Sequence, residues 1–241
     1  MALEKKLTGT LYGVGVGPGD PELITLKAVR LIRSTQVIAY PKLTGGGPSL
    51  ARSIAAEHIS TGKIEIAIET PMLPEKFPDP NVYDRCSDVI SGHLENGEDV
   101  AVLCEGDPFF YGSFIYIFER LAPKYTTKVI AGVSSLGACA GAAGIPLVSG
   151  NQRFEVIPAP IGESLLEKRL MLAEAVAVIK IGRHLEKVKR ILFRLDLVDK
   201  AIFIERATMK NQKIKRVSDP TLKKSAYFSM ILICKYNQGF Q

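Results

Sequence analysis

The sequence LYGVGVGPGDP at residues 11–21 decides the fold class of this chain. Its apolar run at residues 11–16 predicts a buried strand, and the glycines at its end predict a tight turn. Residues 21–33 then carry apolar side chains at helical spacing, with Asp20 as candidate N-cap and Pro21 at the first helical position. A strand, a glycine-rich turn and a helix in this order are typical of an open α/β sheet.

The glycines of this turn do not form the dinucleotide-binding motif GxGxxG. Whichever glycine is taken as the first, the place of the third glycine holds Pro18, Asp20 or Glu22. The next strand, expected at residues 36–39, ends without the acid that holds a ribose hydroxyl in Rossmann folds. A P-loop is absent from the sequence as well. These patterns disfavour a dinucleotide site and a Rossmann-type methyltransferase.

Two more glycine-rich turns follow predicted strands. They lie in VAVLCEGDPFFYGS at residues 100–113 and in AGVSSLGACAGAAGIP at residues 131–146. Gly106 lets the chain approach a ligand closely, and the aromatic residues after it supply an apolar wall. Because carboxyl ends of parallel strands meet at one edge, the three turns together predict a ligand site.

Strands and helices alternate along the rest of the chain, which predicts a mostly parallel sheet in its first part. Strands are expected at residues 64–68, 99–103, 127–130, 154–157, 175–181, 201–205 and 227–235. Helices are expected at residues 48–56, 82–94, 114–121, 135–143, 164–173 and 184–195. Four prolines at residues 71–80 predict an irregular excursion. A linker at residues 145–153 predicts two α/β domains, 1–150 and 151–241, with a cleft between them.

The composition indicates a globular protein with a sizeable core. Of 241 residues, 46% are hydrophobic and 23% are charged, which excludes a disordered chain. No apolar stretch is long enough to span a bilayer, and no secretory signal is visible, so we expect a cytoplasmic protein without membrane contact. Four scattered cysteines and three histidines lack metal-ligand spacing, so we expect isolated thiols and no metal site.

The charge of the chain is +6, and much of it lies at residues 205–224. This segment contains seven basic residues and two acids, and it has no aromatic residue among them. Nucleic-acid binding is therefore not expected, whereas an acidic small molecule or a solvated basic face fits the pattern. The sequence leaves open whether the segment faces a cleft, solvent or a partner subunit.

The turns resemble the signature turns of the tetrapyrrole (corrin/porphyrin) methylases. The matching segments are GVGPGDP (15–21), EGDPFFYG (105–112), GVSSLGACAGAAGIPL (132–147), KIGRHLEKV (180–188), ERATMKNQ (205–212) and YFSMILI (227–233). The resemblance thus covers nearly the whole chain. It is strongest for the branch that methylates carbon-20 of precorrin-2 or cobalt-factor II in cobalamin biosynthesis. One departure is Glu105, where the commoner family pattern has glycine.

The resemblance implies a homodimer of two-domain chains that binds S-adenosylmethionine in the cleft between the domains. This fold is unrelated to that of the Rossmann methyltransferases. Carried over position by position, the family's cofactor contacts fall on Pro18, Glu105, Gly106, Asp107, Phe110, Ser134, Ser135, Ile181, Ala207, Thr208 and Met230.

The implied reaction needs little proton chemistry, because methyl transfer from a sulfonium depends mostly on positioning. One proton must leave the substrate afterwards, and Glu105 and Tyr111 are the candidates to accept it or to bind a pyrrole N–H of the substrate. The implied substrate is an acidic tetrapyrrole, whose carboxylates would pair with basic side chains. The candidate substrate contacts are Lys180, Arg183, His184 and Arg206, with Tyr83 on a flap over the ring.

Other interpretations stay open at this stage. His184 and its neighbours also fit a helix start with a solvated face, and Tyr83 fits an ordinary first helical turn. Methylation at another ring position, a non-catalytic tetrapyrrole carrier and a nicotinamide oxidoreductase are the competing functions. The sequence holds no cobalt ligand, so it does not decide between a metal-free and a cobalt-containing substrate.

Overall fold

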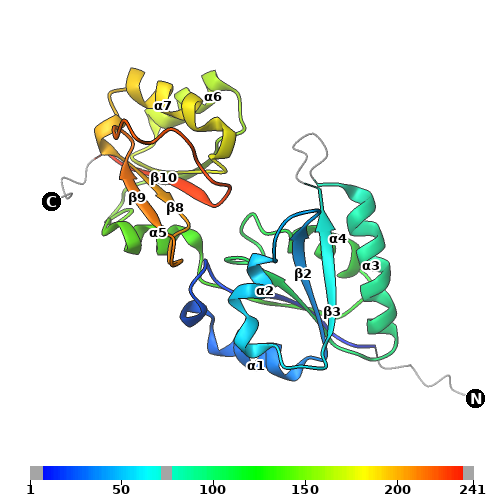
Figure 1. The fold of residues 1–241 in the computed structure, drawn as a ribbon. Helices are drawn as coiled ribbons and strands as arrows, with labels where there is room; N and C mark the ends of the chain where they lie inside the picture. The colour runs from blue at the N-terminus through cyan, green and yellow to red at the C-terminus, as the bar shows by residue number, and fades with distance from the viewer. Residues whose placement is uncertain (1–7, 72–77, 236–241) are drawn as a thin grey trace, which may run out of the picture. The chain divides into compact units, whose positions relative to one another are not determined.

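The computed structural model describes residues 8–71 and 78–235. The chain folds into two compact units, the first ending at Ser134 and the second beginning at Ser135 (Figure 1). Each unit is a five-stranded sheet with helices on both faces. The prediction of two α/β units is therefore confirmed.

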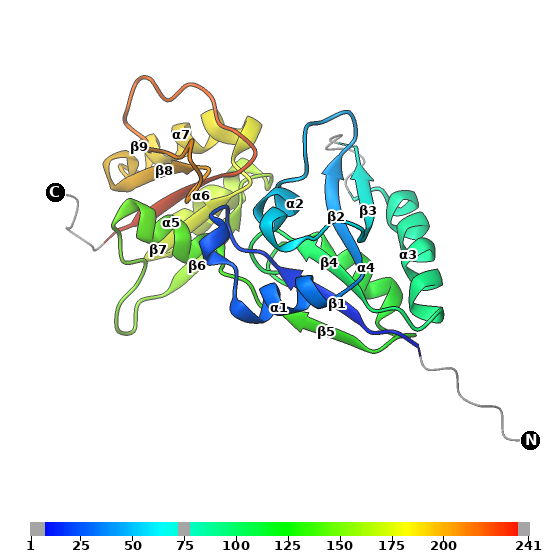
Figure 2. The ribbon, with the colours of Figure 1, turned by 60° about the horizontal axis from the view of Figure 1, so that its bottom comes forward.

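The sheet of the first unit is entirely parallel, with strand order β3-β2-β4-β1-β5 (Figure 2). Its strands are β1 (Leu11–Gly15), β2 (Val37–Leu43), β3 (Ile64–Thr70), β4 (Val100–Cys104) and β5 (Thr127–Ile130). The central strand β4 is buried throughout, as expected for a parallel strand covered on both faces.

Helices cover both faces of this sheet. They are η1 (Pro21–Leu23), α1 (Leu26–Ser34), α2 (Leu50–Ile54), η2 (Ala56–His58), α3 (Pro80–Glu95) and α4 (Phe114–Leu121). Consecutive side chains of β4 point to opposite faces of the sheet: Val102 packs with α3 and α4 on one face, and Leu103 packs with α1 and α2 on the other. The helix expected at residues 21–33 is split, since the Thr25 side chain accepts from the Ala28 amide and starts α1 separately. Residues 72–77 of the proline-rich segment lie outside the described residues.

The sheet of the second unit is mixed, with strand order β6-β7-β10-β8-β9. Its strands are β6 (Phe154–Pro158), β7 (Ala175–Ile179), β8 (Ala201–Glu205), β9 (Lys213–Arg216) and β10 (Ser229–Cys234). Strand β10 is antiparallel to both β7 and β8. The carboxyl ends of β7 and β8 therefore meet at the edge of the sheet where β10 begins.

Three helices and two short 3₁₀ turns complete the second unit, and Figure 1 shows α5 on the opposite face of the sheet from α6 and α7. They are α5 (Ser135–Ala143), α6 (Glu163–Leu172), η4 (Gly182–His184), α7 (Leu185–Arg194) and η5 (Val198–Lys200). The sequence places the domain boundary at residues 150 and 151, after α5. The structure groups α5 with the second unit, because Cys139 and Ala140 pack against the second sheet.

Three features of the described residues relate to expectations from the sequence. Strand β9 lies in the basic segment, where the sequence pattern predicts no strand. The four cysteines are free thiols, three of them buried. None of the described helices combines the length and apolar character required to cross a membrane.

Candidate functional site

The three glycine-rich turns of the first unit meet at one edge of its sheet. They follow β1, β4 and β5, which are neighbours in the order β4-β1-β5 and run parallel. The first two turns are joined by backbone hydrogen bonds: the Gly17 amide donates to the Gly106 carbonyl (3.3 Å), and the Gly106 amide donates to the Gly17 carbonyl (2.8 Å). The predicted convergence of the turns is thus present.

Glycine is required at this junction because the three backbones touch. A Cβ on Gly132 would lie 1.9 Å from the carbonyl oxygen of Gly106, and one on Gly15 would lie 2.6 Å from the same oxygen. Gly17 and Gly106 also have positive φ angles of 81° and 63°. The junction therefore presents backbone rather than side chains at the end of the sheet.

Asp107 fixes the geometry of the second and third turns. Its Oδ1 accepts from the Phe109 amide (2.9 Å), and its Oδ2 accepts from the Gly132 amide (3.0 Å). Both carboxylate oxygens are thus hydrogen-bonded within the first unit. This side chain, a cofactor contact by family resemblance, holds the two turns together.

Glu105 is a partly buried carboxyl group at the end of β4. Its Oε1 accepts a hydrogen bond from the Ala51 amide in the first turn of α2 (3.2 Å). Burial raises the pKa of Glu105, although its hydrogen bonds from backbone amides oppose the shift. A carboxylate with a raised pKa is a better proton acceptor than an exposed one, so Glu105 has the chemistry of a general base.

Aromatic side chains line the turn after Glu105. The Phe110 and Tyr111 rings meet edge to face with centroids 5.1 Å apart, and Phe109 meets Phe118 in the same way at 4.9 Å. Tyr111 is 48% exposed and has a positive φ of 55°. The turn therefore holds a tyrosine at the surface in a backbone conformation that non-glycine residues rarely adopt.

The other expected site residues of the first unit are Pro18, Ser134 and Tyr83. Pro18 and Ser134 are partly exposed in the first and third turns, and Ser135 opens α5 in the next unit. Tyr83 is elsewhere: it is 1% exposed in α3, and its ring packs against that of Tyr116 with centroids 4.8 Å apart and a tilt of 48°. The expectation that Tyr83 lies on a flap over a ligand is corrected by this burial.

In the second unit, the expected residues gather at one sheet edge. Lys180 and Ile181 follow β7 directly, and Arg206, Ala207 and Thr208 follow β8. Met230 at the start of β10 lies between them, because it pairs with Ile179 of β7 and Ile204 of β8. Residues far apart in the sequence are thereby brought to one edge.

Strained backbone concentrates at the expected site residues. Among the described residues, five non-glycine positions have positive φ, and four of them are expected site residues. These four are Tyr111 (55°), Lys180 (57°), Arg206 (53°) and Thr208 (68°). Such strain persists only where the surroundings enforce it, and it clusters at functional sites.

The edge of the second unit combines an apolar base with basic groups. Ile181, Ala207 and Met230 are buried at this edge. Ligand sites are typically lined by apolar side chains with a few polar or charged groups among them, and this edge has both. No cluster of three or more metal-ligating side chains occurs in the part of the chain that the structure describes.

His184 belongs to the basic side of this edge. Burial lowers its pKa, and the nearby charges of Lys187 and Arg183 lower it further. Its imidazole is therefore neutral near pH 7, within 3.5 Å of the Arg183 guanidinium. A neutral His184 binds a carboxylate only as a hydrogen-bond donor, so Lys180, Arg183 and Arg206 carry the positive charge here.

Sequence reasoning missed the contribution of β6 to the same edge. The Lys187 ammonium donates to the carbonyls of Ala159 (2.6 Å) and Ile161 (2.7 Å), and the Ala159 amide donates to the Ile179 carbonyl (2.8 Å). These bonds hold the turn after β6 beside the end of β7. Its signal in the sequence is PAPIG at residues 158–162, again a proline- and glycine-containing turn directly after a strand.

Comparisons with known proteins agree with this arrangement. The family model described as Tetrapyrrole (Corrin/Porphyrin) Methylases matches residues 10–222. The chain is 35% identical over 233 residues to the Precorrin-2 C(20)-methyltransferase of Sinorhizobium sp, covering 93% of this chain and 95% of that protein. It is 26% identical over 233 residues to the Cobalt-precorrin-2 C(20)-methyltransferase of Salmonella typhimurium, covering 95% and 98% respectively.

A solved structure supports the fold. The uroporphyrin-III C-methyl transferase from Thermus thermophilus, complexed with S-adenyl homocysteine, superposes with a TM-score of 0.69 at 22% identity. The superposition covers 93% of this chain and 97% of that chain. The likeness extends over both α/β units.

Proposed function

The chain belongs to the tetrapyrrole (corrin/porphyrin) methylases, and we propose that it methylates carbon-20 of precorrin-2 or of its cobalt-containing counterpart, cobalt-factor II, in cobalamin biosynthesis. The enzyme is then an S-adenosylmethionine-dependent C-methyltransferase. Both similar C(20)-methyltransferases are matched over at least nine-tenths of their length, which supports the same activity for the whole chain.

The observation that carries the proposal is the junction of three glycine-rich turns at the end of the first sheet. Gly15 and Gly132 leave no room for a Cβ there, and Gly106 has a positive φ of 63°, so the three backbones approach one another closely at this edge. A carrier protein would not need such a junction. A nicotinamide enzyme would need a ribose-binding acid, which the turn after β2 lacks.

Membership of the family supports S-adenosylmethionine as the methyl donor, and the candidate contacts follow from the resemblance. Pro18, Gly106 and Ser134 would border it from the first unit, and Ile181, Ala207, Thr208 and Met230 would hold its adenine and methionine parts from the second. Asp107 and Ser135 would support these contacts, and Phe110 would cover them. When bound, the cofactor supplies an electrophilic methyl group on a sulfonium.

The chain's own contribution to the reaction is positioning and proton acceptance. The glycine junction and the strained turns hold backbone groups in fixed places, and such preorganisation supplies much of the barrier reduction. Glu105 Oε atoms accept the proton that leaves the methylated carbon, because burial raises the pKa of this carboxyl group. Tyr111, exposed in the next turn, is the second candidate for this role.

Basic residues at the second edge bind the acidic substrate. Lys180, Arg183 and Arg206 pair with its acetate and propionate groups, and His184 donates a hydrogen bond. We further propose the remaining family properties: a cytoplasmic homodimer, and a functional division of the chain into an N-terminal domain (1–150) and a C-terminal domain (151–241).

A paired turnover assay tests the function. Purified protein and methyl-labelled S-adenosylmethionine are incubated anaerobically with precorrin-2 and, separately, with cobalt-factor II. Mass spectrometry counts the added methyl groups, and NMR locates the label. One label at carbon-20 is expected, and the faster substrate identifies the metal-free or cobalt-containing route. A label elsewhere on the ring contradicts the carbon-20 assignment, and no transfer contradicts the methyltransferase proposal.

A further inference from the structure

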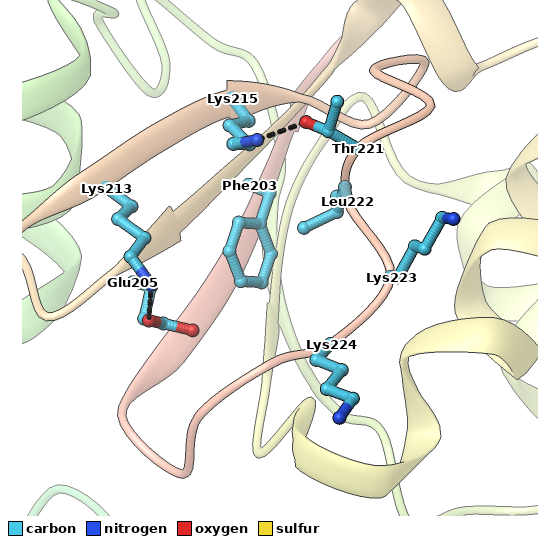
Figure 3. Close-up of a pocket in the computed structure, with 8 residues that line it drawn as sticks. All are labelled: Phe203, Glu205, Lys213, Lys215, Thr221, Leu222, Lys223 and Lys224. Atoms are coloured by element: carbon cyan, nitrogen blue, oxygen red, sulfur yellow. Dashed lines mark hydrogen bonds and ion pairs between the residues drawn. The ribbon is translucent and has the colours of Figure 1, made fainter.

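The second unit contains a pocket with a volume of about 400 Å³ between β8, β9 and the loop that leads to β10 (Figure 3). Phe203 and Leu222, which are 1% and 3% exposed, form its apolar base. Its walls carry Glu205 and Thr221 together with four lysines, Lys213, Lys215, Lys223 and Lys224. An apolar base under several cationic groups suits an amphiphilic anion.

The lysines of β9 already have partners in the pocket wall. The Lys213 ammonium lies 3.2 Å from Glu205 Oε1, and the Lys215 ammonium lies 3.3 Å from Asp219 Oδ2. Lys215 is also hydrogen-bonded to the Thr221 hydroxyl (Figure 3). These two positive charges are therefore compensated within the unit.

The lysines of the facing loop are not compensated in this way. No described carboxylate forms an ion pair with Lys223 or Lys224, and both residues are exposed. In Figure 3 both side chains extend away from the loop, with their ammonium groups directed away from Phe203. Because lysine stems rotate freely, these two groups are available to an anion that enters the pocket.

Glu205 ties the pocket to the edge proposed for the substrate. Burial opposes its ionisation, but the Ala226 amide (2.8 Å to Oε2) and the Lys213 ammonium outweigh burial, and the pKa of Glu205 is lowered. The ionised Glu205 carboxylate therefore links its own strand β8 to Lys213 of β9 and to Ala226 of the loop. Arg206, one of the proposed substrate contacts, follows it directly in the chain.

We infer that this pocket binds a carboxylate-bearing side arm of the tetrapyrrole substrate, with Lys223 and Lys224 pairing with the carboxylate. The inference rests on the proposed function and adds a specificity-determining site to it. The methylenes of the arm cover Leu222 and Phe203, and charge-assisted hydrogen bonds to the two ammonium groups fix its end. A tetrapyrrole that has methyl groups in place of carboxylate arms binds less tightly.

Equilibrium binding tests the pocket without methyl transfer. Fluorescence titration measures the Kd of uroporphyrin III, with acetate and propionate arms, and of coproporphyrin III, in which methyl groups replace the acetates. The wild type is compared with K223Q/K224Q and with the matched control K128Q/K168Q, which removes two exposed lysines elsewhere. Melting temperatures verify that both variants fold.

The pocket variant is expected to bind uroporphyrin III roughly tenfold more weakly, as loss of a charge-assisted hydrogen bond implies. The control is expected to stay within about twofold of the wild type, because isolated exposed charges contribute little. An unchanged Kd in K223Q/K224Q, or an equal loss in the control, overturns the inference. The proposed function fails separately, if the wild type transfers no methyl group to either precorrin substrate.

Discussion

The carboxyl group of Glu105 is partly buried. Among the described residues, the Ala51 amide is the one hydrogen-bond donor to it besides the backbone of Glu105 itself. Because burial raises its pKa in the folded chain, protonation favours folding. The stabilising contribution is full below the unfolded pKa and is lost as pH rises through the folded pKa. The ionised form that the proposed reaction requires is therefore maintained at a cost to stability.

Glu105→Gln is expected to raise the melting temperature at pH 8 by a few degrees, roughly what 1 kcal/mol gives in a chain of this size. Glutamine keeps the acceptor for the Ala51 amide but carries no charge. The gain should vanish near pH 3, well below the ordinary pKa of a glutamate, where Glu105 is protonated in both the folded and the unfolded chain. Scanning calorimetry at both pH values measures it, with Glu57→Gln at an exposed position as control. An equal effect at both pH values contradicts the assigned cause.

The same variant separates proton acceptance from cofactor binding. Glu105→Gln is expected to lower turnover by about 100-fold, the range of a lost general base, and to leave the Kd of S-adenosylhomocysteine nearly unchanged. In the wild type, the rate should rise with pH through the raised pKa of Glu105. Turnover assays across pH and calorimetric titration check these outcomes. Unchanged turnover in the variant would contradict proton acceptance by Glu105 and would leave Tyr111 as the candidate acceptor.

At Gly132, a single methyl group is enough to disturb the turn junction. Gly132→Ala places a Cβ 1.9 Å from the Gly106 carbonyl oxygen, so we expect a loss of about 2 kcal/mol in unfolding free energy. Gly137→Ala is the matched control, because nothing lies within 4 Å of its added Cβ and it stands inside α5. Alanine there should stabilise by roughly 0.5–1 kcal/mol. Urea unfolding of both variants measures the contrast, and equal effects would contradict the crowded junction.

At the scale of elements, the sequence predicts the bounds of helices and strands best where apolar residues are frequent and turn residues flank them. The bounds of α4, α5, β5 and β8 agree with the expected ranges, since each has an unbroken apolar pattern or clear turn residues on both sides. Strand β9 was not predicted, because an exposed edge strand needs only backbone pairing with β8 and its sequence KIKR is mostly charged.

Parts of the candidate site could likewise be predicted from the sequence, and other parts could not. The turns are predictable because Gly15 and Gly132 stand where backbones touch and Gly106 has a positive φ, and these requirements are visible as glycine in the sequence. By contrast, no residue type in the sequence marks whether a given side chain on a helix faces the core or the solvent. Tyr83 lies one turn into α3, and only its packing on Tyr116 decides that it enters the core.

At the scale of the molecule, the position of α5 decides where the chain divides. Its buried residues Cys139 and Ala140 pack against β8 and neighbouring strands of the second sheet, with Ile145 beside them. The sheet face opposite α6 and α7 is apolar, since it carries residues such as Ile204 and Leu232. Without α5, that face would be exposed to water. A chain divided at the linker after α5 would therefore lose the cover of the second sheet, so we place the structural boundary before α5.

Separate production of the second unit tests this division. A fragment of residues 135–241 is expected to unfold cooperatively in urea, whereas a fragment of residues 151–241 should bind the dye ANS and aggregate, because its sheet lacks the cover of α5. Adding Cys139→Asp to the longer fragment should reproduce the behaviour of the shorter one, since a charge cannot be buried there at low cost. Gly141→Ala, with open space around its Cβ, serves as the control substitution. Cooperative unfolding of the shorter fragment would contradict the division at Ser135 and favour the boundary that the linker at residues 145–153 predicts.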